Sequence, residues 1–169
     1  MKSSALLTIL VTLCFTTPEC GKHGTALPPE KAAQARRAIV TYLECEECTK
    51  DEVEAVVKLG KIAVPTLIAT LREGPPRTNL EIYRRHLTTN YRELKEYERT
   101  HPNVKVPGSE QEYIESYLDN YDTLYRVRAA AALGTIGGAD VREALEDVSR
   151  LPLRNDVREA VKASLGKMK

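Results

Sequence analysis

The 169-residue chain has no tryptophan, a single phenylalanine and almost no surplus of charge. Its 25 lysines and arginines are balanced by 24 aspartates and glutamates, so the formal net charge is +1. Nucleic acids and anionic membranes are bound through a large positive surplus, which makes both poor partners for this chain. With 42% hydrophobic and 29% charged residues, the chain is also too apolar for intrinsic disorder, and its length fits one domain.

Sequence motifs that indicate catalysis or cofactor binding are also missing. The chain has no glycine-rich phosphate loop, no nucleophile elbow and no HExxH zinc motif. Its three histidines are isolated from one another in the sequence, which favours solvated or capping roles. We therefore expect a protein that is not an enzyme, with no catalytic residue, no bound metal and no cofactor.

A run of about 20 apolar residues, which a membrane-spanning helix needs, is absent as well. The chain instead begins with Lys2 and an uncharged apolar run at residues 5–15, a pattern typical of a secretory signal peptide. We expect residues 1–26 to be signal peptide and tether, and the mature protein to be periplasmic or secreted, with no transmembrane span. Cys20 is a candidate lipidation site, which would make the product a membrane-anchored lipoprotein.

Strict two-residue alternation and hairpin dipeptides such as Asn-Gly are lacking, which argues against strands. Apolar residues recur at helical spacing instead, and the chain is predicted to be all-α. Two capping boxes, Thr49 with Glu52 and Ser109 with Glu112, indicate where two helices begin. Helices are expected over residues 30–46, 50–59, 64–73, 78–100 and 110–136.

The two longest expected helices should form an antiparallel hairpin, because only a short loop joins them. Residues 72–105 hold eight bases and five acids, whereas residues 106–125 hold five acids and no base. Opposite charges are expected to favour the pairing modestly, since an exposed ion pair contributes about 0–1 kcal/mol.

A short signature of leucine, glycine, any residue and an apolar residue occurs at residues 59–62, 133–136 and 165–168. The clearest surrounding stretches are VRAAAALGTIGGADVREALEDV and NDVREAVKASLGKM, and LGKIAVPTLIATL is a more degenerate copy. The pattern resembles the HEAT-like repeats, in particular the short, alanine-rich type named after the phycobilisome lyases.

The resemblance implies a short α-solenoid of stacked helix pairs over residues 27–169, with a long helical hairpin inserted at about residues 75–124. It implies a non-catalytic protein–protein interaction scaffold or accessory subunit, which the signal peptide places in the bacterial cell envelope. A lyase-like or chaperone-like protein acting on a prosthetic group is the alternative, and export argues against it. A purely structural envelope module is a third interpretation.

Small and basic residues of the repeats have expected structural roles. The four alanines at residues 129–132 should let neighbouring helices approach closely. Arg126 and Arg158 occupy matched positions and should donate to the carbonyls of a neighbouring turn. Three glycines of the signature are expected to end helices. These are Gly60, Gly134 and Gly166.

Cys45 and Cys48 lie between two expected helices, and a structural disulfide is the leading interpretation for an exported chain. A redox-active pair, a metal site and two free thiols stay open. Neighbouring glutamates argue against the redox pair, and the lack of a second CxxC argues against the metal site. Haem attachment would need a histidine where Thr49 stands.

Seven of the eight tyrosines fall within residues 83–125. Aromatic stripes at helical spacing are usually core, but tyrosine is also enriched in protein interfaces, and both interpretations stay open. The expected partner is another protein. The intramolecular face of the second long helix should be filled by Ile114, Leu118, Tyr121 and Tyr125. The candidate partner-binding residues are Tyr113, Tyr117, Arg84, Arg85 and Arg92.

Overall fold

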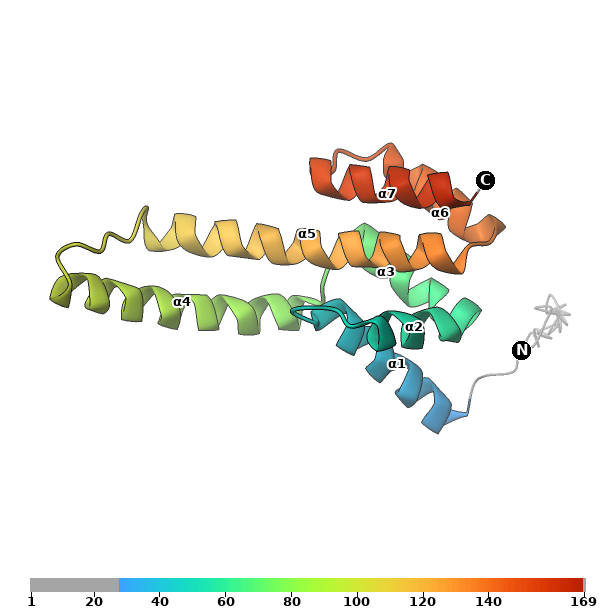
Figure 1. Cartoon of the computed structure of the whole chain (residues 1–169), viewed down its shortest axis with the longest axis horizontal. Coiled ribbons are helices and arrows are strands. Elements are labelled where there is room, and N and C mark those ends of the chain that lie inside the picture. Colours follow the sequence, from blue (N-terminus) through green and yellow to red (C-terminus); the bar gives the residue numbers. More distant parts are fainter. Residues whose placement is uncertain (1–27, 169) are drawn as a thin grey trace, which may run out of the picture.

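A computed structural model of the chain describes residues 28–168. The predicted signal peptide, its cleavage site and Cys20 lie outside these residues. The described chain is all-helical, which confirms the predicted fold class, and it contains no strand. Its helices (Figure 1) are α1 (Pro29–Glu44), α2 (Lys50–Leu59), α3 (Val64–Glu73), α4 (Arg77–Thr100), α5 (Glu110–Ile136), α6 (Ala139–Ser149) and α7 (Asn155–Lys167).

The local signals in the sequence set the helix boundaries. Both predicted capping boxes are confirmed: the Thr49 N–H donates to the Glu52 carboxylate at 2.7 Å, and the Ser109 N–H donates to the Glu112 carboxylate at 2.7 Å. The returning bonds to the two hydroxyls are also present. Helix α1 ends two residues earlier than expected, because Cys45 already has an extended backbone with ψ of 137°.

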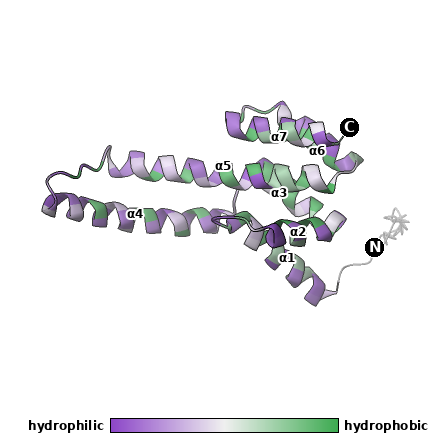
Figure 2. Ribbon diagram, in the orientation of Figure 1, coloured by the Kyte–Doolittle hydropathy of each residue, from purple (hydrophilic) through white to green (hydrophobic). Residues whose placement is uncertain are grey.

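The hydrophobic core lies in a body formed by α1, α2, α3, α6, α7 and the C-terminal half of α5 (Figure 1). Helix α5 is central, because it contacts each of the other helices. Figure 2 shows the most hydrophobic ribbon on α3 and on the C-terminal part of α5. Large side chains with almost no exposure fill this core: Val56, Leu67, Leu71, Leu133, Leu145, Val148 and Val161.

Small side chains let α5 and α7 approach closely, as the alanine run predicts. The Ser164 hydroxyl of α7 donates to the Ala130 carbonyl of α5 at 2.8 Å. Gly134 faces the same serine, and a Cβ atom built on this glycine would lie 2.5 Å from the Ser164 Cβ. The contact therefore requires glycine at this position of α5.

The expected role of the signature glycines is confirmed at one position and wrong at two. Gly60 follows α2 with a φ of 53°, a conformation that suits glycine. Gly134 and Gly166 instead lie inside α5 and α7. Helix α5 runs on to Ile136 and ends at Gly137, whose φ is 69°.

Helix α4 and the N-terminal half of α5 form the expected antiparallel hairpin, which projects from the body (Figure 1). Among the ion pairs of the described residues, none joins α4 to α5. The opposite charges of the two helices therefore do not hold the hairpin together through direct pairs. Aromatic side chains make this contact.

Candidate interaction surface on the helical hairpin

A cluster of tyrosines fixes the base of the hairpin to the body. The Tyr121 ring lies 4.6 Å from the Tyr83 ring and 4.9 Å from the Tyr125 ring, measured between centroids. The Tyr125 hydroxyl donates to the Glu44 carboxylate of α1 at 2.7 Å, and the Asn79 amide donates to the same oxygen at 2.8 Å. Burial raises the pKa of Tyr125 far above its ordinary value, so its phenol stays protonated and keeps this bond.

A second cluster lies near the tip of the hairpin. The Tyr113 ring is 5.4 Å from the Tyr91 ring of α4 and 4.6 Å from the Tyr117 ring, and the buried Tyr91 donates to the Gly108 carbonyl at 3.0 Å. The two predicted anchors differ in exposure. Tyr113 is half-buried between the helices, whereas Tyr117 is exposed. The tyrosines thus form the hairpin contact and also reach its surface.

The three arginines predicted to accompany these tyrosines lie elsewhere on α4. At about 100° per residue, Arg84 is turned by about 100° from Tyr83, while Arg85 and Arg92 are turned by about 160° and 180°. Their exposed side chains therefore leave the helix away from the tyrosine rings. The structure does not bring Arg84, Arg85 and Arg92 together with Tyr113 and Tyr117.

Exposed apolar side chains gather on one side of the hairpin. Of the eight large hydrophobic side chains that are exposed in the described chain, five lie on α4 and α5, with exposed fractions between 39% and 50%. Helical spacing places the three on α4 within an arc of about 120° and the two on α5 within about 20°. We call these five the apolar face: Ile82, Leu94, Tyr97, Tyr117 and Leu124.

Two open grooves show that the apolar sides of α4 and α5 point in the same direction. The tip groove has a volume of about 600 Å³ and brings Leu94 of α4 beside Tyr117 of α5. The base groove, of about 380 Å³, brings Ile82 and His86 of α4 beside Tyr121 of α5, and Glu44 of α1 lines it as well. The apolar face therefore extends along both helices.

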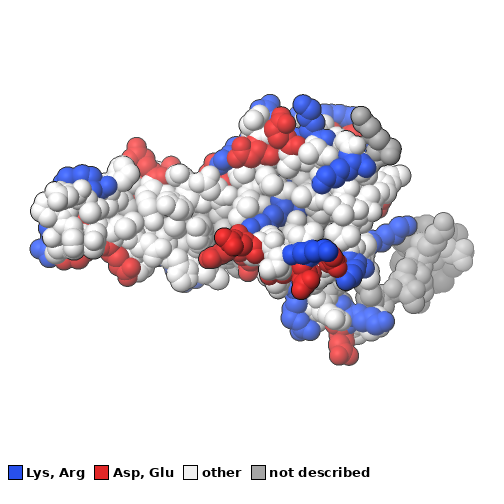
Figure 3. Space-filling view, in the orientation of Figure 1, with Lys and Arg blue, Asp and Glu red and all other residues white. Residues whose placement is uncertain are grey.

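Charged side chains are few on this side of the hairpin. Figure 3 shows largely uncharged atoms along the hairpin on the side turned to the viewer, with charge concentrated at its margins and tip. Lys105 and Glu112 border the tip groove, and the spacing of α4 places Glu93 at the edge of its apolar arc. An exposed apolar surface with charged residues at its rim favours apolar contacts.

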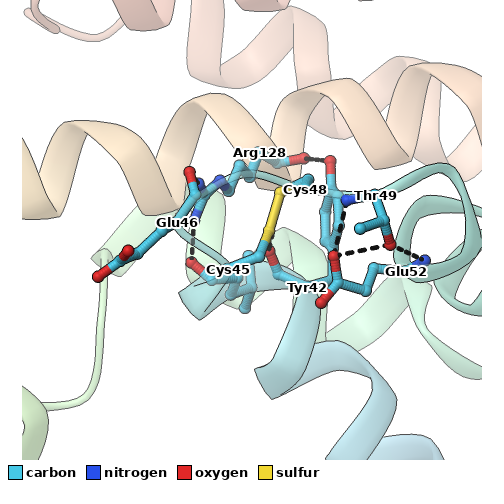
Figure 4. Close-up of a disulfide and its surroundings, with 8 residues drawn as sticks. Tyr42, Cys45, Glu46, Cys48, Thr49, Glu52 and Arg128 are labelled. Atoms are coloured by element: carbon cyan, nitrogen blue, oxygen red, sulfur yellow. Dashed lines mark hydrogen bonds between the residues drawn. A yellow bond between two sulfur atoms is a disulfide. The ribbon is translucent and has the colours of Figure 1, made fainter.

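The cysteine pair lies at the junction of α1 and α2 (Figure 4). The Cα atoms of Cys45 and Cys48 are 5.2 Å apart, and the sulfur atoms are at disulfide distance, as the leading interpretation requires. The pair closes the turn between the end of α1 and the cap of α2. This position suits a structural link between two helices.

Arg128 of α5 secures the same junction, and sequence analysis missed it. The residue is only 9% exposed, and its guanidinium donates to the Leu43 carbonyl at 2.8 Å and to the Glu46 carbonyl at 3.5 Å. The Tyr42 hydroxyl donates to the Arg128 carbonyl at 3.1 Å (Figure 4), and burial raises the pKa of this phenol. The cation therefore lies at the C-terminal end of α1, where the helix dipole favours positive charge. An arginine within an alanine-rich helix was the available signal.

The predicted role of the matched repeat arginines is confirmed at one of them. The Arg126 guanidinium donates to the Leu71 carbonyl at 3.0 Å and to the Arg72 carbonyl at 2.6 Å, at the end of α3. Arg158 is exposed and donates instead to the Asn155 side chain of its own helix at 3.4 Å. The two positions are thus not equivalent in the structure.

Residues 28–168 contain no group of three or more His, Cys, Asp or Glu side chains that could hold a metal ion. None of the helices described has both the length and the apolar character that crossing a membrane requires. Comparisons with protein families, with curated proteins and with solved structures found no match to the chain.

Proposed function

We propose that the protein is a non-catalytic interaction protein, a scaffold or accessory subunit whose hairpin binds another protein through the apolar face. One observation carries this proposal: of the eight large hydrophobic side chains exposed within residues 28–168, five lie on one sparsely charged side of a projecting hairpin. Contiguous apolar surface rimmed by polar residues is typical of a protein contact. The partner surface that fits is helical, apolar and uncharged.

The thin core of the hairpin supports the same proposal. Only three residues between positions 80 and 120 are buried, namely Leu87, Tyr91 and Ile114. Two helices alone bury little apolar surface, and helical hairpins gain most of their stability from further helices packed against them. A partner on the apolar face would add the layer that the body supplies only at the base.

The repeat resemblance and the cell-envelope location form part of the proposal. The three copies of the Leu-Gly signature lie at the C-terminal ends of α2, α5 and α7. The first two copies are each followed by another helix, α3 and α6, and these two helices contact each other. This equivalence supports a short HEAT-like stack as the body. The apolar run at residues 5–15 supports export.

Tagged chain purified from its native source provides the test. Wild type, Tyr117→Glu and Gln111→Glu are compared, because Gln111 is exposed and lies about 120° from Tyr117 around α5. A protein retained by wild type and Gln111→Glu is purified, and its Kd for all three is measured. We expect Tyr117→Glu alone to weaken binding at least about 10-fold. Equal binding to all three proteins, or no retained protein at all, neither a different protein nor an untagged copy of the chain itself, would refute the proposal.

A further inference from the structure

The apolar face can serve as both sides of one contact, because its charge, size and apolar side chains suit pairing with the same face of a second copy. We infer that two copies of the chain pair hairpin to hairpin through this face and form a four-helix assembly. The inference rests on the proposed function, since it names the partner of the same surface. The occupant of the apolar face is thus a second copy of the chain.

Charge is the first argument for a second copy. A surface that meets its own copy places like charges near like charges, and such contacts are unfavourable. The charged groups near the face are Glu93 beside Ile82 at one end of the α4 arc, Lys105 and Glu112 at the tip groove, and Glu44 at the base groove. The five side chains of the face itself are apolar. Arg84, Arg85 and Arg92 of α4 leave the helix on sides other than the apolar face. The face therefore meets its own copy without opposing like charges at its centre.

Area is the second argument. Helix α4 has 24 residues and is therefore about 36 Å long. Two helices side by side are about 20 Å wide, which gives a footprint of about 700 Å² on each copy. A stable protein interface buries about 800 Å² on each partner. The hairpin thus offers close to the area that a specific dimer needs.

Core formation is the third argument. Four-helix bundles place apolar side chains of all four helices in one core, whereas each hairpin alone has only Leu87, Tyr91 and Ile114 buried between positions 80 and 120. Pairing two hairpins would cover the five exposed side chains of each apolar face. Because the same patch is used on both copies, the contact closes at two subunits and does not grow into a fibre.

Sedimentation equilibrium of the full chain tests the inference over a range of protein concentrations. We expect wild type to reach twice the 18.9 kDa mass of the chain, or twice the mass of its processed form. Leu94→Glu and Tyr117→Glu should raise the dimer Kd at least about 10-fold. Gln111→Glu should dimerise as wild type does. Circular dichroism checks that each variant keeps its helices. If a glutamate variant loses helicity, Leu94→Ser and Tyr117→Ser replace the pair.

The result that overturns the inference is a wild type that stays monomeric at every concentration, or a dimer that neither Leu94 nor Tyr117 variants weaken. The Kd measured for a retained protein distinguishes a failure of this inference from a failure of the proposed function. A monomeric wild type that binds a different protein, with loss in Tyr117→Glu only, overturns the second copy and leaves the proposed function standing. A monomeric wild type with no binding that depends on Tyr117 overturns both.

Discussion

Arg128 shows how much one residue contributes to the junction of α1 and α2. It is buried, it donates to two backbone carbonyls, and no carboxylate pairs with it among the ion pairs described. Buried charge is costly unless its hydrogen bonds are made, so these two carbonyls hold the guanidinium in place. The same bonds fix α5 against the end of α1.

Replacing Arg128 with methionine should destabilise the protein by about 2–3 kcal/mol, because it leaves the Leu43 and Glu46 carbonyls without their charged donor. Urea denaturation measures the change. Arg158→Met is the matched control, since Arg158 is exposed and an ordinary surface change stays within about 0.5 kcal/mol. Equal losses in the two variants would contradict the role of Arg128.

Gly134→Ala should destabilise the protein by about 1–3 kcal/mol, although alanine is the better helix former. The reason is steric, since the new Cβ would lie 2.5 Å from the Ser164 Cβ. Gly166→Ala is the control: it is also helical, and nothing lies within 4 Å of its added Cβ. This control should be stabilising by up to about 1 kcal/mol. Thermal melts compare the two, and a stable Gly134→Ala would refute the close contact.

At the scale of the elements, α5 links the two parts of the molecule. Its C-terminal half lies in the core of the body, and its N-terminal half forms one side of the projecting hairpin (Figure 1). Two features hold other elements to it: the Tyr125 cluster at the base of the hairpin and the Arg128 junction beside the cysteine pair. Each can be removed separately.

The double variant Cys45→Ala/Cys48→Ala should keep its helical circular dichroism spectrum. The pair closes a loop with a sequence separation of only three residues, so losing it should cost at most about 2 kcal/mol. Arg128 continues to hold the junction. Denaturation of wild type with and without reductant gives the same comparison without mutation. Loss of helicity in the variant would show that the pair is essential for folding.

Tyr125→Phe tests the base of the hairpin through pH. Burial raises the pKa of Tyr125 in the folded protein above the value near 10 of the unfolded chain, so the folded state binds its proton more tightly. Stability from this group is complete below about pH 10 and is lost as pH rises further. The variant should lose about 1 kcal/mol at neutral pH and decline less steeply in alkali. An identical alkaline decline would contradict this account.

At the scale of the whole molecule, local signals in the sequence predicted most of the fold. The Thr49 and Ser109 capping boxes and the stops before Gly60 and Gly74 gave the helix boundaries within about two residues. Several long-range side-chain contacts were not predicted, because no local pattern in the sequence identifies both partners. Arg154, the residue before α7, donates for example to Asp119 of α5 at 2.5 Å across 35 positions.

The candidate site was predicted only in part, because its details depend on contacts between residues that are far apart in the sequence. The tyrosine-rich hairpin was found from composition and spacing, but the division of roles between half-buried Tyr113 and exposed Tyr117 depends on how α4 packs on α5. The arginines on α4 illustrate the opposite case. Their sequence position next to the tyrosines suggested a rim, whereas the helical turn directs them to other sides of the hairpin.

The central claim is that the apolar face contacts a protein, and site-specific photo-cross-linking in the native host tests it most directly. A photoreactive amino acid is placed at position 117 in one protein and at position 111 in another. The account predicts a cross-linked protein product from position 117, and none, or far less, from position 111. No product from position 117, or equal products from both positions, would contradict it.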